Sequence, residues 1–170
     1  MAESELHKVA NDPTREETRE SAFIIRPPKS EDYELMASLA TQLGYPSNPA
    51  EIEARVDAMR DKRKFAVYVA EDESGAVIGW ISAFVFIAVE SEACGEINGL
   101  VVADGARSRG AGKELLQAVE AWARGQGLTS VCVRSNVLRE RAHRFYLRHG
   151  YEPVKDQRVF SKSWGKADRL

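Results

Sequence analysis

The chain has 170 residues, 44% of them hydrophobic, which is enough to bury the core of one globular domain. Its 26 acidic and 24 basic residues leave a formal net charge of −2, with both signs mixed, which argues against nucleic acid or an anionic membrane as a partner. Because there is neither a long apolar run nor a basic and then apolar N-terminal leader, we expect a cytoplasmic protein without a membrane partner.

Apolar residues recur at strand spacing in some stretches and at helix spacing in others. Residues 1–21 are charged and poor in large apolar side chains, which predicts a loose tail. In the first half of the chain the pattern predicts a strand at 23–25, a helix from a cap at Ser30 to Gly44, a helix starting at Asn48 and Pro49, and a β-hairpin of strands 65–70 and 77–87. The second half follows with a strand at 96–102, a helix at about 110–125, a strand at 130–135 and a helix around 142–146. One or two closing strands are expected within 151–164. This order of elements predicts an α/β protein with helices on both faces of its sheet.

The chain contains two cysteines, Cys94 and Cys132, and they have no metal-ligand spacing. We expect reduced thiols, with Cys132 in a strand and Cys94 in a loop, and no disulfide between them in a reducing compartment. The sequence predicts no metal site.

A basic loop that contains glycines follows the apolar strand at 97–102 and opens an amphipathic helix. A helix N-terminus presents backbone N–H groups without intrahelical partners and a partial positive charge, so this arrangement is suited to phosphate. Gly110 and Gly112 allow the backbone to approach a ligand closely. Two common phosphate motifs are excluded, because the dinucleotide fingerprint needs glycine at Leu115 and a Walker loop needs Ser or Thr at Glu114.

The spacing that does fit is R-x-x-G-x-G, at Arg107, Gly110 and Gly112. It resembles the acetyl-CoA loop of the GNAT family of N-acetyltransferases. A second motif of that family, N-x(n)-A-x-x-F-Y-x-x-x-G-[FY], is matched further on by six residues: Asn136, Ala142, Phe145, Tyr146, Gly150 and Tyr151. Two motifs in the right order are far more specific than either alone, and the matched region spans about 97–151.

The resemblance implies a mixed, mostly antiparallel central sheet with a splayed parallel strand pair and helices on both faces. The domain would span 22–165, between tails at 1–21 and 166–170. Gly99 lies inside the strand that would border the splay, and a glycine there indicates either a bulge or a close approach by a neighbouring aromatic side chain.

The resemblance also implies acetyl-CoA as co-substrate, without a metal. Backbone groups of the strand would bind the pantetheine arm and polarise the thioester carbonyl, loop residues would bind the pyrophosphate, and a side chain across the gap would hold the arm. The residues implied are Leu100, Val101 and Val102 in the strand, Arg107, Ser108, Arg109, Gly110, Ala111, Gly112 and Lys113 in the loop, and Asn136 across the gap.

Acetyl transfer to an amine needs a neutral amine, a polarised carbonyl and a proton for the leaving thiolate. Tyr146 matches the family's general acid, although a structural phenol that donates to a backbone carbonyl is the alternative. Glu96 matches the catalytic glutamate of one branch of the family, and its alternative is an exposed carboxylate at a strand end. Many members carry an acid where this chain has Asn98, so either Glu96 acts, through water if necessary, or the amine arrives already neutral.

The implied function is transfer of an acetyl group from acetyl-CoA directly to a primary amine on a small molecule or a peptide. A non-catalytic module that binds acyl-CoA on the same fold remains an alternative, and an unrelated nucleotide binder is disfavoured by Glu114 and Leu115. In this family the segment at about 30–62 forms one wall of the acceptor pocket. Neither the identity of the amine nor the existence of a homodimer can be read from these residues.

Overall fold

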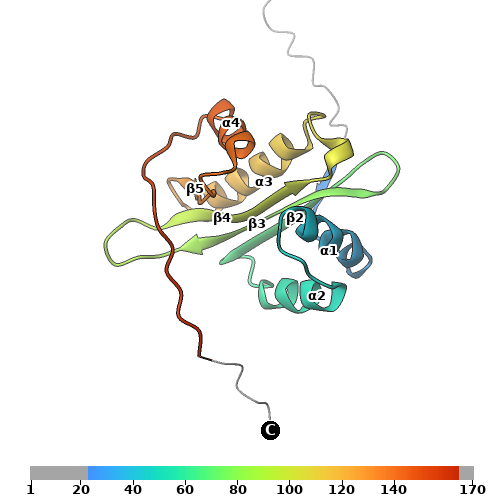
Figure 1. Cartoon of the computed structure of the whole chain (residues 1–170), viewed down its shortest axis with the longest axis horizontal. Helices are drawn as coiled ribbons and strands as arrows, with labels where there is room; N and C mark the ends of the chain where they lie inside the picture. Colours follow the sequence, from blue (N-terminus) through green and yellow to red (C-terminus); the bar gives the residue numbers. More distant parts are fainter. Residues whose placement is uncertain (1–22, 165–170) are drawn as a thin grey trace, which may run out of the picture.

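In the computed structural model, which describes residues 23–164, one twisted sheet is covered on both faces by helices (Figure 1). Its five strands follow the chain order and are β1 (Ile24–Arg26), β2 (Phe65–Glu71), β3 (Val77–Phe86), β4 (Cys94–Val102) and β5 (Val131–Val133). Neighbouring strands are antiparallel except β4 and β5, which are parallel. The predicted mixed, mostly antiparallel sheet with one parallel pair is therefore confirmed. The tails expected at 1–21 and 166–170 lie outside the described residues.

Two helices lie on one face of the sheet and two on the other (Figure 1). The first pair is α1 (Tyr33–Gln42) and α2 (Pro49–Ala58), and the second pair is α3 (Ala111–Gly125) and α4 (Glu140–Arg148). Single turns of 3₁₀ helix, η1 (Ser30–Asp32) and η2 (Asp104–Ala106), precede α1 and follow β4. These helices match the predicted ones, with α4 longer than the expected 142–146.

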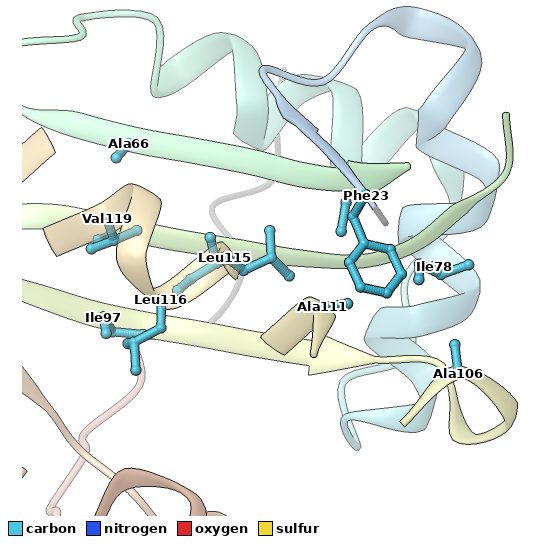
Figure 2. Packing of buried hydrophobic residues seen from close by; sticks show 12 residues of the cluster. Phe23, Ala66, Ile78, Ile97, Ala106, Ala111, Leu115, Leu116 and Val119 are labelled. Atoms are coloured by element: carbon cyan, nitrogen blue, oxygen red, sulfur yellow. The ribbon is translucent and has the colours of Figure 1, made fainter. Parts of the chain in front are cut away.

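The larger core lies between α3 and the sheet. Leu115, Leu116 and Val119 of α3 are almost completely buried, together with Ile81 of β3 and Ile97 of β4 (Figure 2). Their spacing along α3 places them on one face of the helix, as the sequence pattern requires. Truncating a leucine in such a core to alanine costs about 2–5 kcal/mol, so this face of α3 anchors the helix and the loop that precedes it.

The start of α2 agrees with the sequence, whereas the start of α1 does not. The Asn48 side chain accepts a hydrogen bond from the amide of Glu51 at 2.9 Å, and the Glu51 carboxylate accepts one from the amide of Asn48 at 3.1 Å. The predicted cap at Ser30 is wrong. Ser30 is the first residue of η1 instead, and the Asp32 carboxylate at the end of this turn accepts the Lys29 amide at 2.7 Å and pairs with Arg26 at 2.6 Å.

Three boundaries near β4, β5 and the C-terminal segment differ from the predictions. Cys94 is the first residue of β4 rather than a loop residue, and β5 is shorter than the predicted 130–135. The closing strands predicted within 151–164 are wrong, because this segment has no regular secondary structure and its apolar side chains Val154, Val159 and Phe160 are exposed. A local apolar pattern becomes a strand only where a neighbouring edge pairs with it.

Candidate acetyl-CoA and amine site

The strands β4 and β5 part halfway along β4. Their pairing ends where Ile97 lies opposite Val133, while β4 continues to Val102. Along this second half, β4 pairs with β3 on one edge only, and β5 does not cover its other edge. Backbone groups on that edge are therefore not paired with a neighbouring strand. This parting of β4 and β5 is the splay that the family resemblance implied.

A β-bulge marks the point where the strands part. Ser82 of β3 pairs with Gly99, but Ala83 pairs with Ile97, so Asn98 is the extra residue on β4. Both sequence interpretations of Gly99 hold, since a Cβ built on it would lie 2.6 Å from Cζ3 of the Trp80 ring. The Asn98 side chain is held by the Ser82 hydroxyl, which donates to its Oδ1 at 2.8 Å.

A pocket opens in the gap between the parted strands. Residues of β4, of β5 and the loop after it, of α4 and of the connection between α1 and α2 line it: Leu43, Tyr45, Ile97, Asn98, Gly99, Leu100, Val133, Arg134, Ser135, Asn136, Arg139, Ala142 and Tyr146. Three of the predicted site residues, Leu100, Asn136 and Tyr146, thus come together in one pocket from three parts of the chain. The predicted wall at 30–62 contributes Leu43 and Tyr45.

Tyr146 reaches the pocket from the inner side of α4. Its ring packs edge-to-face on Phe145, with centroids 5.3 Å apart, and tilts against Tyr151 at 5.5 Å. Burial raises the pKa of Tyr146 to about 12, so the phenol is neutral at physiological pH and can act as a hydrogen-bond donor. Among the described residues its hydroxyl has no hydrogen-bond partner, which leaves it available to a ligand.

The loop before α4 closes the pocket on one side. The Asn136 side-chain oxygen accepts the Leu138 amide at 2.9 Å, which fixes the side chain and leaves its NH₂ group to donate elsewhere. Arg139 spans the pocket and donates to the Leu43 carbonyl at the end of α1, at 2.7 Å. The two walls are therefore joined by one hydrogen bond.

The predicted phosphate loop leads directly into α3. Gly110 precedes the first helical residue with φ +104°, and Ser108 has φ +65°, so the loop adopts backbone conformations that side chains with a Cβ rarely tolerate. The N–H groups of Ala111 and Gly112 stand in the first turn of α3, where helices provide no acceptor. The loop thus presents unpaired N–H groups at the positive end of a helix.

The side chains of this loop are more occupied than the sequence suggested. Arg107 donates to the Val102 carbonyl at 3.1 Å and pairs with Asp104, so it holds the loop against the end of β4. The Arg109 guanidinium lies over the Phe23 ring, 5.8 Å from its centre. Gly112 faces the Phe145 ring, and a Cβ there would lie 3.4 Å from its Cε2, at ordinary contact distance.

The predicted base, Glu96, lies beside the pocket rather than in its lining. Its side chain is 8% exposed, and its Oε2 accepts from Arg134 at 3.1 Å. The Arg134 guanidinium also stacks over the Phe86 ring, 5.2 Å from its centre. Glu96 is thus a buried partner of an arginine that does line the pocket, and not the exposed strand-end carboxylate of the alternative interpretation.

Cys94 and Cys132 approach each other across the parallel strands, next to Glu96. Both are free thiols, and their sulfurs lie 3.0 Å apart. Burial and the neighbouring thiol raise the pKa of Cys132 to about 12. Among residues 23–164, no group of three or more His, Cys, Asp or Glu side chains could hold a metal ion, and no helix is long and apolar enough to cross a membrane.

Sequence reasoning missed the two arginines that line the pocket, Arg134 and Arg139. A signal for Arg134 was present, because the two-residue period of a strand places it on the same face as Asn136. No local signal pointed to Arg139, since it reaches the pocket from the loop before α4.

The fold and the site define an α/β protein with a pocket between two parallel strands that part and a glycine-containing loop at the start of α3. Residues 32–151 match the Acetyltransferase (GNAT) family, and the chain belongs to this family. It is an acyltransferase that depends on acetyl-CoA.

Relatives and solved structures agree with this assignment. Over 117 residues the chain is 32% identical to an uncharacterized N-acetyltransferase of Bacillus subtilis, YhdJ, covering 69% of this chain and 79% of the relative. Two solved structures have the same fold at 20% identity. The acetyltransferase AAC(6')-Iy, solved with a bisubstrate analogue of CoA and acetylneamine, has a TM-score of 0.73 and matches 85% of this chain and all of its own. Glucosamine-6-phosphate N-acetyltransferase of Arabidopsis thaliana has a TM-score of 0.70, with 84% and 99% covered.

Proposed function

We propose that this protein transfers the acetyl group of acetyl-CoA directly to a primary amine on a small molecule or peptide. The observation that carries the proposal is the pocket in the β4–β5 gap, which holds a neutral phenol at Tyr146. Tyr146 and the loop at the start of α3 are connected through Phe145, whose ring packs on Tyr146 and faces Gly112.

Each part of the site has one proposed task. The first-turn amides of α3 and the backbone at Ser108–Gly112 bind the pyrophosphate, with Arg109 and Lys113 adding positive charge and Arg107 holding the loop in shape. The uncovered edge of β4, at Leu100, Val101 and Val102, binds the pantetheine arm and polarises the thioester carbonyl, while the Asn136 amide holds the arm from the other side.

In the reaction the amine nitrogen forms a bond to the acetyl carbon, and the bond from that carbon to sulfur breaks. The Tyr146 hydroxyl donates to the departing sulfur and recovers its proton from solvent. Glu96 is the proposed acceptor of the amine's proton. Because its carboxylate lies behind Arg134, it acts through a water molecule or after a small movement of that side chain.

An assay for released thiol, run with acetyl-CoA and a panel of amines, tests the proposal. At least one amine should release CoA and gain an acetyl group, as seen by mass spectrometry. Calorimetry with acetyl-CoA, CoA, ATP and NAD provides the second measurement. Binding of acetyl-CoA without transfer to any amine would favour the non-catalytic alternative, and absence of binding would refute both.

The role of Glu96 has its own test. If Glu96 accepts the proton, Glu96→Gln should lower kcat/KM about 10²- to 10⁴-fold at neutral pH, and the loss should shrink as pH rises and the amine becomes neutral without help. Wild-type kcat/KM over the whole pH range would refute this role. An increase in KM for the amine alone would instead indicate that Glu96 only positions Arg134.

A further inference from the structure

We propose that the acceptor amine carries an anionic group, a carboxylate or a phosphate, which Arg134 and Arg139 bind. This inference rests on the proposed function and narrows it to a class of substrates. It starts from the charges that line the pocket. Within the described part of the chain, Arg134 and Arg139 are the charged residues of the lining, and no carboxylate is among them.

Arg134 is held in a fixed orientation and still has donors to spare. The Phe86 ring lies under its guanidinium, and Glu96 accepts one of its hydrogen bonds. A guanidinium has five N–H donors, so the bond to Glu96 leaves most of them free. Its side chain is 58% exposed, whereas that of Glu96 is 8% exposed, so the pocket presents the cation and not its partner.

Arg139 adds a second cation to the lining of the pocket. One of its nitrogens is bonded to the Leu43 carbonyl, which places the guanidinium across the pocket near the connection between α1 and α2. Two guanidiniums with bonded partners are pre-organised, and planar N–H pairs match the geometry of carboxylate and phosphate oxygens. A polycationic amine would meet two like charges in the same pocket.

The same charges favour the chemistry at the reacting nitrogen. A nearby positive charge disfavours the ammonium form and so lowers the pKa of an amine bound there. The neutral amine needed for attack would therefore be more populated in this pocket than in water. This lowering of the amine pKa would add to the action of Glu96 as a base. It matters here because the chain has Asn98 at a position where many family members carry an acid.

Matched acceptor pairs test the proposal. Each pair shares one amine and differs by the anionic group: an α-amino acid with its carboxamide, and glucosamine 6-phosphate with glucosamine, which separate carboxylate from phosphate. An aminoglycoside serves as the cationic acceptor. We expect kcat/KM to be at least about tenfold higher for the anionic member of one pair, and this advantage to fall with added salt.

Variants then locate the effect. Arg134→Gln should raise the KM of the preferred anionic acceptor about 10- to 100-fold, the range expected for a lost charge-assisted hydrogen bond, while the KM of acetyl-CoA and of the uncharged partner stays unchanged. Arg134→Lys should recover part of the loss. Arg144→Gln is the matched control, since Arg144 lies on the outer side of α4, 67% exposed and paired with Glu140.

The outcomes separate this inference from the function on which it rests. Transfer to uncharged or cationic amines with equal or higher kcat/KM would refute the anionic acceptor and leave the acetyltransferase intact. If Arg134→Gln raised the KM of both members of a pair by the same factor, the anionic acceptor would also be refuted. If no amine is acetylated, calorimetry measures the affinity of the CoA-saturated protein for both members of each pair. Equal affinities for the anionic member and its uncharged partner would refute the inference.

Discussion

Removing one oxygen atom from Tyr146 gives the sharpest test of the site. Tyr146→Phe keeps the ring that packs on Phe145 and Tyr151 and deletes the hydroxyl that has no hydrogen-bond partner among the described residues. Stability should therefore change by less than about 0.5 kcal/mol. Because the proton donor to sulfur is lost, kcat should fall roughly 10²-fold, which corresponds to about 2.7 kcal/mol of transition-state stabilisation.

A matched control, Tyr151, lies just beyond the end of α4. The Tyr151 hydroxyl donates to the Glu120 carboxylate at 3.2 Å and does not line the pocket. Tyr151→Phe should cost about 1 kcal/mol of stability, as for a lost hydrogen bond, with kcat nearly unchanged. The assays are steady-state thiol release for kcat, calorimetry for acetyl-CoA affinity and denaturant unfolding for stability. Full activity in a folded Tyr146→Phe protein would refute the general-acid role and return Tyr146 to packing.

Three further predictions concern pH, the loop and the thiols. Burial raises the pKa of Tyr146 to about 12, whereas a free tyrosine titrates near 10. The contribution of Tyr146 to stability is therefore complete below about pH 10 and is lost as pH rises toward 12. Over this range, the free energy of unfolding measured with denaturant should fall more for wild type than for Tyr146→Phe. Gly110→Val should weaken acetyl-CoA binding tenfold or more, about 1.4 kcal/mol, because φ at this residue is +104°. Gly75→Val in the β2–β3 turn, at φ +81°, introduces similar strain and should leave the affinity for acetyl-CoA unchanged. If both variants bind acetyl-CoA with equal affinity in calorimetry, the loop does not hold the pyrophosphate. Oxidised glutathione should link Cys94 to Cys132, whose sulfurs lie 3.0 Å apart, and release two glutathione thiols. The reaction should be faster at higher pH because the thiolate is the attacking form. Intact mass before and after reduction measures the link, and mixed disulfides with glutathione in its place would contradict the close approach of the two sulfurs.

Short-range patterns in the sequence were enough to predict most of the fold. The hydrophobic stripe of α3, the Asn48–Glu51 cap of α2 and the hairpin around Gly75 each depend on residues within a few positions of one another. The loop at Gly110 was predicted for the same reason. Its left-handed conformation and its place at the start of α3 follow from the local order of strand, glycine and helix.

Long-range packing accounts for the rest. Arg26 is far from Glu71 in the chain and bonds to it at 2.6 Å, Cys94 meets Cys132 across two strands, and Arg139 reaches Leu43 between two helices. No local pattern encodes such pairs, because their distance depends on how whole elements pack. The same limit explains the failure at 151–164, where an apolar pattern had no strand edge to pair with.

The site combines both kinds of information. The resemblance to the family's motifs pointed to Tyr146, Asn136 and the glycine loop, and the structure brings Tyr146 and Asn136 into one pocket. The charge of the pocket came from packing. Arg134 points into the gap because Phe86 and Glu96 support it, and Glu96 lies behind it because the strand buries that face. The charge of the pocket lining therefore depends on contacts between distant segments, whereas membership of the family was readable from the order of residues along the chain.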